Sequence, residues 1–176
     1  MNYFDLFDIP VQLRVDGKDL HKKYIALSRR LHPDFFANES EELKESASQK
    51  TANLNMAWLT LRNPMLTIKY VLEQKGLLTN DEQYALPSGF LMEMMEVNEE
   101  LMELDGEDRE ALEKFEQKIA DYEQQYDDSV ALIVENYQEG TTTQEELLQV
   151  KLYYYQKKYL NRIKEQLTNN ANVNEK

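Results

Sequence analysis

Apolar residues recur at spacings of three, four and seven along most of the chain, which predicts amphipathic α-helices. The first long helix follows Asp16, a residue type that caps helix N-termini, and runs to about Leu31. Its apolar face carries Leu20, Tyr24, Leu27 and Leu31, and its other side carries Lys22, Lys23, Arg29 and Arg30. Pro33 cannot continue a helix, so we expect a loop that contains His32, Pro33 and Asp34.

A second long helix is predicted from about Ser40, with a buried stripe at Leu43, Ala47, Leu54, Ala57, Trp58 and Leu61. Asn63 and Pro64 form an N-cap and first-turn pair that starts a further short helix, which Gly76 closes. Residues 77–88 contain Thr79-Asn80-Asp81 and Pro87-Ser88, so we predict a linker whose Ser88 caps the next helix.

The second half of the chain predicts three more helices, at residues 89 to about 105, 107 to about 137 and 143 to about 167. Thr143 and Glu146 have the spacing of a capping box at the start of the last of them. An antiparallel bundle is the simplest packing for three such helices. The Asn-rich residues 169–176 are expected to be a disordered tail.

The helix from Gly89 has a second apolar strip beside the face needed for packing. Leu91, Met95 and Met102 form this strip, and it is bordered by Met92, Glu96, Glu99 and Glu103. Either the linker or another helix covers the strip, or it is an adaptable, methionine-rich docking site rimmed by carboxylates for a basic partner. The pattern alone leaves both interpretations open.

Composition narrows the classes of protein. The 176 residues contain no cysteine, which excludes disulfides and thiolate metal sites, and the acidic start without a long apolar run predicts no secretory leader. Residues 1–75 hold 11 Lys and Arg against 10 Asp and Glu, a net charge of +1, whereas residues 76–176 have a net charge of −14. Such an acidic C-terminal half disfavours binding to nucleic acid and to anionic membranes. No apolar stretch has the length of a membrane span. We expect a soluble cytoplasmic protein.

The two histidines, His21 and His32, do not form a metal-ligand set with any carboxylate cluster. His32 and Asp34 flank a proline and have no nucleophile or cofactor motif at a recognisable spacing. We therefore expect no metal, no cofactor and no enzymatic activity. By itself the tripeptide indicates only a turn. Its position between a basic amphipathic helix and a second long helix is more informative than its residue types.

That context resembles the J-domain of DnaJ-type co-chaperones over residues 1–75, and more closely the HscB (Hsc20) family of iron–sulfur cluster assembly. The resemblance extends over nearly the whole chain and is to the bacterial type, because the four-cysteine module of eukaryotic members is absent. Its motifs are Tyr3-Phe4-Asp5-Leu6-Phe7, Leu31-His32-Pro33-Asp34, Ala57-Trp58, Thr60-Leu61-Arg62-Asn63-Pro64, Tyr70-Val71-Leu72 and Phe90-Leu91-Met92-Glu93.

The resemblance implies an all-α fold, in which a J-domain made of a helical hairpin and short helices (1–75) is joined by a linker (76–88) to a three-helix bundle (89–168). It also implies two partners. A 70-kDa heat-shock-type chaperone (HscA type), whose ATPase is stimulated, binds His32, Pro33, Asp34, Lys22, Lys23, Arg29 and Arg30. An iron–sulfur cluster scaffold (IscU type) binds Leu91, Met92, Met95, Glu96, Glu99, Glu103 and Tyr154.

One departure from the J-domain pattern lies next to the tripeptide. J-domains commonly have Lys or Arg after the aspartate, whereas this chain has Phe35 and Phe36. Three alternatives remain: a general co-chaperone for other clients, a structural helical adaptor whose tripeptide is only a turn, and, more remotely, nucleic-acid binding through the basic helix.

Overall fold

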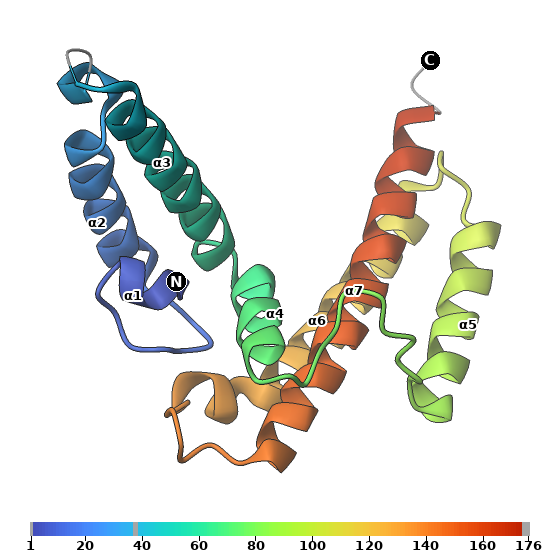
Figure 1. Ribbon diagram of the computed structural model, residues 1–176. Helices are drawn as coiled ribbons and strands as arrows, with labels where there is room; N and C mark the ends of the chain where they lie inside the picture. The colour runs from blue at the N-terminus through green and yellow to red at the C-terminus, as the bar shows by residue number, and fades with distance from the viewer. Residues whose placement is uncertain (1, 37–38, 174–176) are drawn as a thin grey trace. The chain divides into compact units, whose positions relative to one another are not determined.

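The structure, a computed structural model, describes residues 2–36 and 39–173, and the regular elements in these residues are all helical (Figure 1). The all-α prediction is therefore confirmed. Seven α-helices and one 3-10 helix are described: α1 (Tyr3–Leu6), α2 (Gly17–Arg30), η1 (Pro33–Phe36), α3 (Glu41–Leu61), α4 (Pro64–Gln74), α5 (Ser88–Glu103), α6 (Arg109–Glu135) and α7 (Gln144–Val173). They divide into two compact units, one of residues 1–76 with 134–142 and one of residues 77–133 with 143–176.

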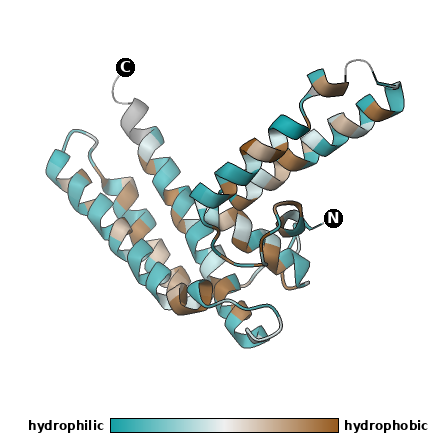
Figure 2. Ribbon diagram, turned by 90° about the vertical axis from the view of Figure 1, so that its left-hand side faces the viewer, coloured by the Kyte–Doolittle hydropathy of each residue, from teal (hydrophilic) through white to brown (hydrophobic). Residues whose placement is uncertain are grey.

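In the first unit, α2 and α3 form a hairpin with η1 at its tip (Figure 1). The Tyr24 ring stacks on Trp58 with ring centroids 4.6 Å apart, and the Tyr24 hydroxyl donates to Asn55 Oδ1 at 3.0 Å. Apolar residues alternate with polar ones along the long helices (Figure 2), so each helix has a face that can be buried. The core of the hairpin is made by Leu20, Leu54, Ala57 and Leu61.

The starts of α2, α4 and α7 follow the capping residues that the sequence predicts. Asp16 Oδ1 accepts hydrogen bonds from the backbone N–H groups of Lys18 and Asp19 at 2.7 and 3.0 Å, and these bonds lower the pKa of the Asp16 carboxyl. Asn63 caps α4 in the same way, with Pro64 in the first turn. At α7 the capping box is complete, because the Glu146 N–H donates to Thr143 Oγ1 and the Thr143 N–H donates to Glu146 Oε2.

In the second unit, α5, α6 and α7 pack as an antiparallel bundle (Figure 1). Between α6 and α7, the buried Lys157 Nζ lies 2.6 Å from Glu123 Oε1 and 3.0 Å from Asp127 Oδ1. Between α5 and α6, Lys118 pairs with Glu100. Phe90 of α5 packs against the rings of Tyr126 and Tyr159. Apolar packing and lysine–carboxylate pairs thus join all three helices.

The segment expected to be a linker is packed against α7. Leu78 is buried, the Tyr84 ring stacks on Tyr155 with centroids 4.4 Å apart, and Glu82 pairs with the buried Lys151. The Lys151 ammonium lowers the pKa of Glu82. This anchoring needs partners from a distant part of the chain, so turn-forming residues in the sequence do not reveal it.

Three local predictions are wrong. Ser88 does not cap α5, because Pro87 occupies the N-cap position without a side-chain hydrogen bond and Ser88 is already helical. Leu43 is exposed, since the buried stripe of α3 starts at Ala47. Helix α7 continues to Val173, so residues 169–173 are not a disordered tail; no glycine or proline interrupts them, and residues 174–176 lie outside the described residues.

The Glu123–Lys157 pair predicts a pH-dependent stability of the bundle. Hydrogen bonding to Lys157 lowers the pKa of Glu123 from its ordinary 4.5. The ionised carboxylate therefore stabilises the fold above pH 4.5, and this contribution is lost as the pH falls through the lower folded-state pKa. We expect Glu123→Gln to lower the free energy of unfolding by about 1–2 kcal/mol at pH 7, a difference that shrinks under acid.

Amide hydrogen exchange of α6 and α7 at several pH values measures this difference. Glu116→Gln is the matched control, because Glu116 is exposed on the same helix. We expect the control to change stability by less than about 0.5 kcal/mol. An equal effect of both substitutions, or one that does not change with pH, would contradict the assignment.

Candidate functional site

The tripeptide lies between the C-terminus of α2 and the 3-10 helix η1. The Asp34 N–H donates to His32 Nδ1 at 3.3 Å, and the Phe35 N–H donates to the His32 carbonyl at 3.0 Å. Asp34 Oδ2 lies 3.4 Å from the same Nδ1 and its side chain is 87% exposed. The Asp34 carboxylate is therefore available to a partner.

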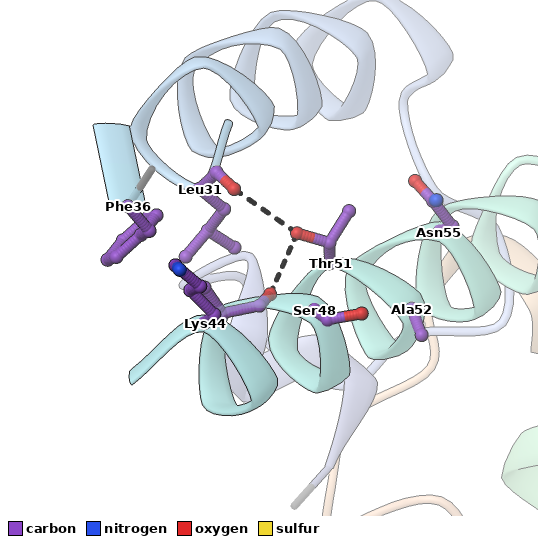
Figure 3. A pocket seen from close by; sticks show the side chains of 8 residues that line it. Leu31, Phe36, Lys44, Ser48, Thr51, Ala52 and Asn55 are labelled. Atoms are coloured by element: carbon purple, nitrogen blue, oxygen red, sulfur yellow. Dashed lines mark hydrogen bonds between the residues drawn. The ribbon is translucent and has the colours of Figure 1, made fainter. Parts of the chain in front are cut away.

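The two phenylalanines after Asp34 have different surroundings. Phe35 is 70% exposed, whereas Phe36 is half-buried and forms a wall of a groove against α3. This α3 groove has a volume of about 460 Å³ (Figure 3), and it is lined by Leu31, Phe36, Lys44, Ala47, Ser48, Thr51, Ala52 and Asn55. The 3-10 turn therefore places an exposed carboxylate, an exposed ring and a groove wall on three consecutive residues.

Three of the four predicted basic residues of α2 are available to a partner. Lys22, Arg29 and Arg30 are exposed, and none forms an ion pair with another residue that the structure describes. Arg29 and Arg30 occupy the last turn of α2, directly before the loop. The cationic side of α2 therefore continues up to the tripeptide.

Lys23, the fourth of these residues, also makes structural contacts. Its ammonium group donates to the Phe7 and Asp8 carbonyl oxygens at 3.0 and 2.9 Å, and it lies 3.8 Å from Asp19. Asp8 adopts a left-handed backbone conformation with φ of 49°, which turns the chain after α1. Lys23 donates hydrogen bonds to the carbonyl groups at this turn, so its ammonium group stabilises the turn after α1.

The second predicted surface lies on the outer side of α5. Phe90, Met94, Val97 and Leu101 are buried in the bundle. Leu91, Met92 and Met95 are 39%, 65% and 61% exposed, and Met102 is exposed as well. Glu96, Glu99 and Glu103 are also exposed. Within the second unit this strip is therefore uncovered, because the segment before α5 packs on α7.

Tyr154 of α7, the remaining predicted residue, is half-buried. Its ring meets Tyr155 edge-on with centroids 5.3 Å apart, and Tyr155 stacks on Tyr84. Tyr154 thus belongs to an aromatic cluster that includes the segment preceding α5.

The described residues show neither a metal centre nor a membrane span. No three His, Cys, Asp or Glu side chains among them gather as metal ligands would. None of their helices is long and apolar enough to cross a membrane.

Comparisons with known proteins agree with this organisation. Residues 86–168 match a family model described as the HSCB C-terminal oligomerisation domain. Over 129 residues the chain is 39% identical to the co-chaperone protein HscB homolog of Vibrio cholerae, covering 72% of this chain and 75% of the relative. The chain belongs to the HscB family. The Vibrio vulnificus homologue is 42% identical over 123 residues, which cover 68% of this chain and 72% of the relative.

Solved HscB structures have the same fold. The chain is similar to chaperone HscB from Vibrio cholerae with a TM-score of 0.77 and 30% identity, over 98% of this chain and 99% of the other. It is similar to the crystal structure of human co-chaperone protein HscB with a TM-score of 0.80 and 27% identity, over 96% and 81% of the two chains. An HscB-family chain has a J-domain and a helical C-terminal domain, and its relatives are named as co-chaperones rather than as enzymes.

Sequence reasoning missed the α3 groove and the role of Lys23. The small side chains Ala47, Ser48 and Ala52 on the loop-facing side of α3 are a signal for the groove, but they give a cavity only where Phe36 and Leu31 pack beside them. No sequence signal separates Lys23 from Lys22, because the Phe7 and Asp8 carbonyl groups reach Lys23 only through the fold.

The different roles of these two lysines can be tested by stability. We expect Lys23→Met to lower the free energy of unfolding of the J-domain by about 1–2 kcal/mol, since it removes charged hydrogen bonds to two carbonyl groups. Lys22→Met, the control, should change it by less than about 0.5 kcal/mol. Urea unfolding followed by the fluorescence of Trp58, the single tryptophan, reports on this unit. Equal stability of the two variants would contradict the structural role of Lys23.

Proposed function

We propose that this HscB-family protein is an adaptor between two proteins of iron–sulfur cluster assembly. Its bundle binds the cluster scaffold, of the IscU type, and its J-domain brings that scaffold to a 70-kDa chaperone of the HscA type and stimulates ATP hydrolysis there. The catalysis belongs to the chaperone. The observation that carries the proposal is the presence of two exposed surfaces of opposite chemistry on two separate compact units.

The J-domain surface suits an acidic chaperone surface. Lys22, Arg29 and Arg30 are unpaired within the described residues, so an acidic partner gains their charge without breaking an existing ion pair. Complementary charge accelerates encounter and fixes the register of docking. Next to this positive face, the exposed Asp34 carboxylate adds a single negative group that a cationic side chain of the chaperone can bind.

The α5 surface suits a basic segment with apolar anchors. Met92 and Met95 are flexible, polarisable side chains that adapt to the shape of a partner. Glu96, Glu99 and Glu103 are exposed at their side, and α5 contains no Lys or Arg to neutralise them. An apolar centre with an acidic rim favours a positively charged partner over a generic unfolded chain.

The domain assignment belongs to the same proposal. Residues 1–75 serve the chaperone, residues 89–168 serve the scaffold, and residues 76–88 connect the two functions. The HscB C-terminal family match over 86–168 and the division of the chain into two compact units support this assignment.

Steady-state ATP hydrolysis by the chaperone tests the proposal, with this protein and the scaffold added singly and together. We expect more-than-additive stimulation, and we expect Asp34→Asn to abolish it without unfolding the J-domain, because this carboxylate is exposed and has no part in the core. Stimulation that is the same with and without the scaffold would indicate a general co-chaperone. The absence of any stimulation would indicate a structural adaptor.

Scaffold binding tests the α5 surface separately. The triple substitution of Leu91, Met92 and Met95 by Ala should raise the scaffold Kd at least about tenfold, since buried apolar anchors contribute roughly 1 kcal/mol or more each. Chaperone stimulation without scaffold should be unchanged. Leu148→Ala is the control, because Leu148 is an apolar residue of the same unit that is about as exposed as Leu91 and lies outside the strip. Isothermal titration calorimetry gives the Kd, and an unchanged value for the triple variant would remove the strip from the site.

A further inference from the structure

The α3 groove is adjacent to the loop that we assign to the chaperone. Leu31 and Phe36, two of its walls, lie within two residues of the tripeptide on either side. In Figure 3 Leu31 and Phe36 lie beside Lys44 and Thr51, and Ser48 and Ala52 of α3 complete the lining. Consecutive Cα atoms are about 3.8 Å apart, so a surface that touches Asp34 comes within roughly 7–8 Å of Phe36.

Among the described residues, most polar side chains of the groove already have partners, the Ser48 hydroxyl being the exception. The Thr51 hydroxyl lies 2.9 and 3.3 Å from the Ala47 and Leu31 carbonyl oxygens, as the dashed lines in Figure 3 mark. Lys44 Nζ pairs with Glu41 at 2.9 Å, and Asn55 Oδ1 accepts the Tyr24 hydroxyl. A ligand in the groove therefore gains little from hydrogen bonds and gains mainly by removing apolar surface from water.

The size of an interface indicates which molecule covers this surface. A stable protein–protein interface buries about 800 Å² on each partner, which is far more than a three-residue loop presents. A chaperone docked on His32, Pro33 and Asp34 must therefore also cover neighbouring surface, and both the cationic side of α2 and the α3 groove adjoin the loop.

We infer that the α3 groove receives an apolar side chain of the 70-kDa chaperone when the chaperone docks on the loop. Carboxylates flank that side chain on the side that faces Arg29 and Arg30. The inference rests on the proposed chaperone docking and adds an apolar anchor to its charged contacts. Ser48 and Ala52 are then residues that determine affinity for the chaperone, by leaving the groove open.

Two pairs of matched substitutions test the inference in the full-length protein. Ser48→Trp fills the groove, whereas Ser46→Trp places the same ring on an exposed position of α3 outside the groove. Ala52→Gln places a polar amide in the groove without an aromatic ring, and Asn53→Gln is its neighbour outside. All four positions are exposed, so the hairpin core is unchanged.

The measurement is the concentration of this protein that gives half-maximal stimulation of the chaperone ATPase. We expect Ser48→Trp and Ala52→Gln to raise it at least tenfold and to leave the maximal stimulation near that of the unsubstituted protein, while both controls stay within twofold. Chemical-shift changes of the Ala47 and Ala52 methyl groups on adding chaperone would support occupation of the groove directly.

Other outcomes overturn the inference in distinguishable ways. If the unsubstituted protein gives no stimulation, the proposed function fails and the inference fails with it. If stimulation and its dependence on Asp34 hold but groove and control variants behave alike, only the inference fails. A groove variant that loses self-association or scaffold affinity, with unchanged half-maximal stimulation, would assign the groove to another occupant.

Discussion

Packing of the apolar face of α2 on α3 is the interaction on which the position of the His32-Pro33-Asp34 loop depends. The Tyr24–Trp58 stack and the buried Leu20 and Leu54 hold the two helices together, and the loop closes the open end of this hairpin. Local hydrogen bonds then fix the conformation of the loop, because the N–H groups of Asp34 and Phe35 both donate to His32. A short, exposed tripeptide thereby acquires a defined shape on a rigid support.

Each unit packs its helices through one face of each helix, which leaves an uncovered surface on each unit. In the hairpin, the side of α2 away from α3 keeps its cations in water, since lysine and arginine are costly to bury without a partner. In the bundle, α5 is an outer helix and needs only one buried face, so a second apolar strip stays exposed. Exposed methionines beside carboxylates add little to the stability of the bundle, which is consistent with a strip that serves binding.

Buried lysines illustrate how the fold assigns different roles to the same residue type. Lys157 and Lys151 are buried against carboxylates of α6 and of the segment before α5, where they join separate parts of the second unit. Lys23 joins α2 to the turn after α1. Lys22, one residue earlier, faces solvent. Charge counts along the sequence treat all four alike, although only the last is available to attract a partner from solution.

The sequence by itself determined the helices, their main caps at Asp16, Asn63 and Thr143, and the two faces of α2 and α5. These features depend on residues within one or two turns of each other, so local spacing and capping chemistry are sufficient. Only the tertiary structure decided which side chains are free, because that depends on residues distant in the chain. The anchoring of Tyr84 and Glu82 on α7, the use of Lys23 at the α1 turn, and the groove between Phe36 and α3 all arise from such long-range packing.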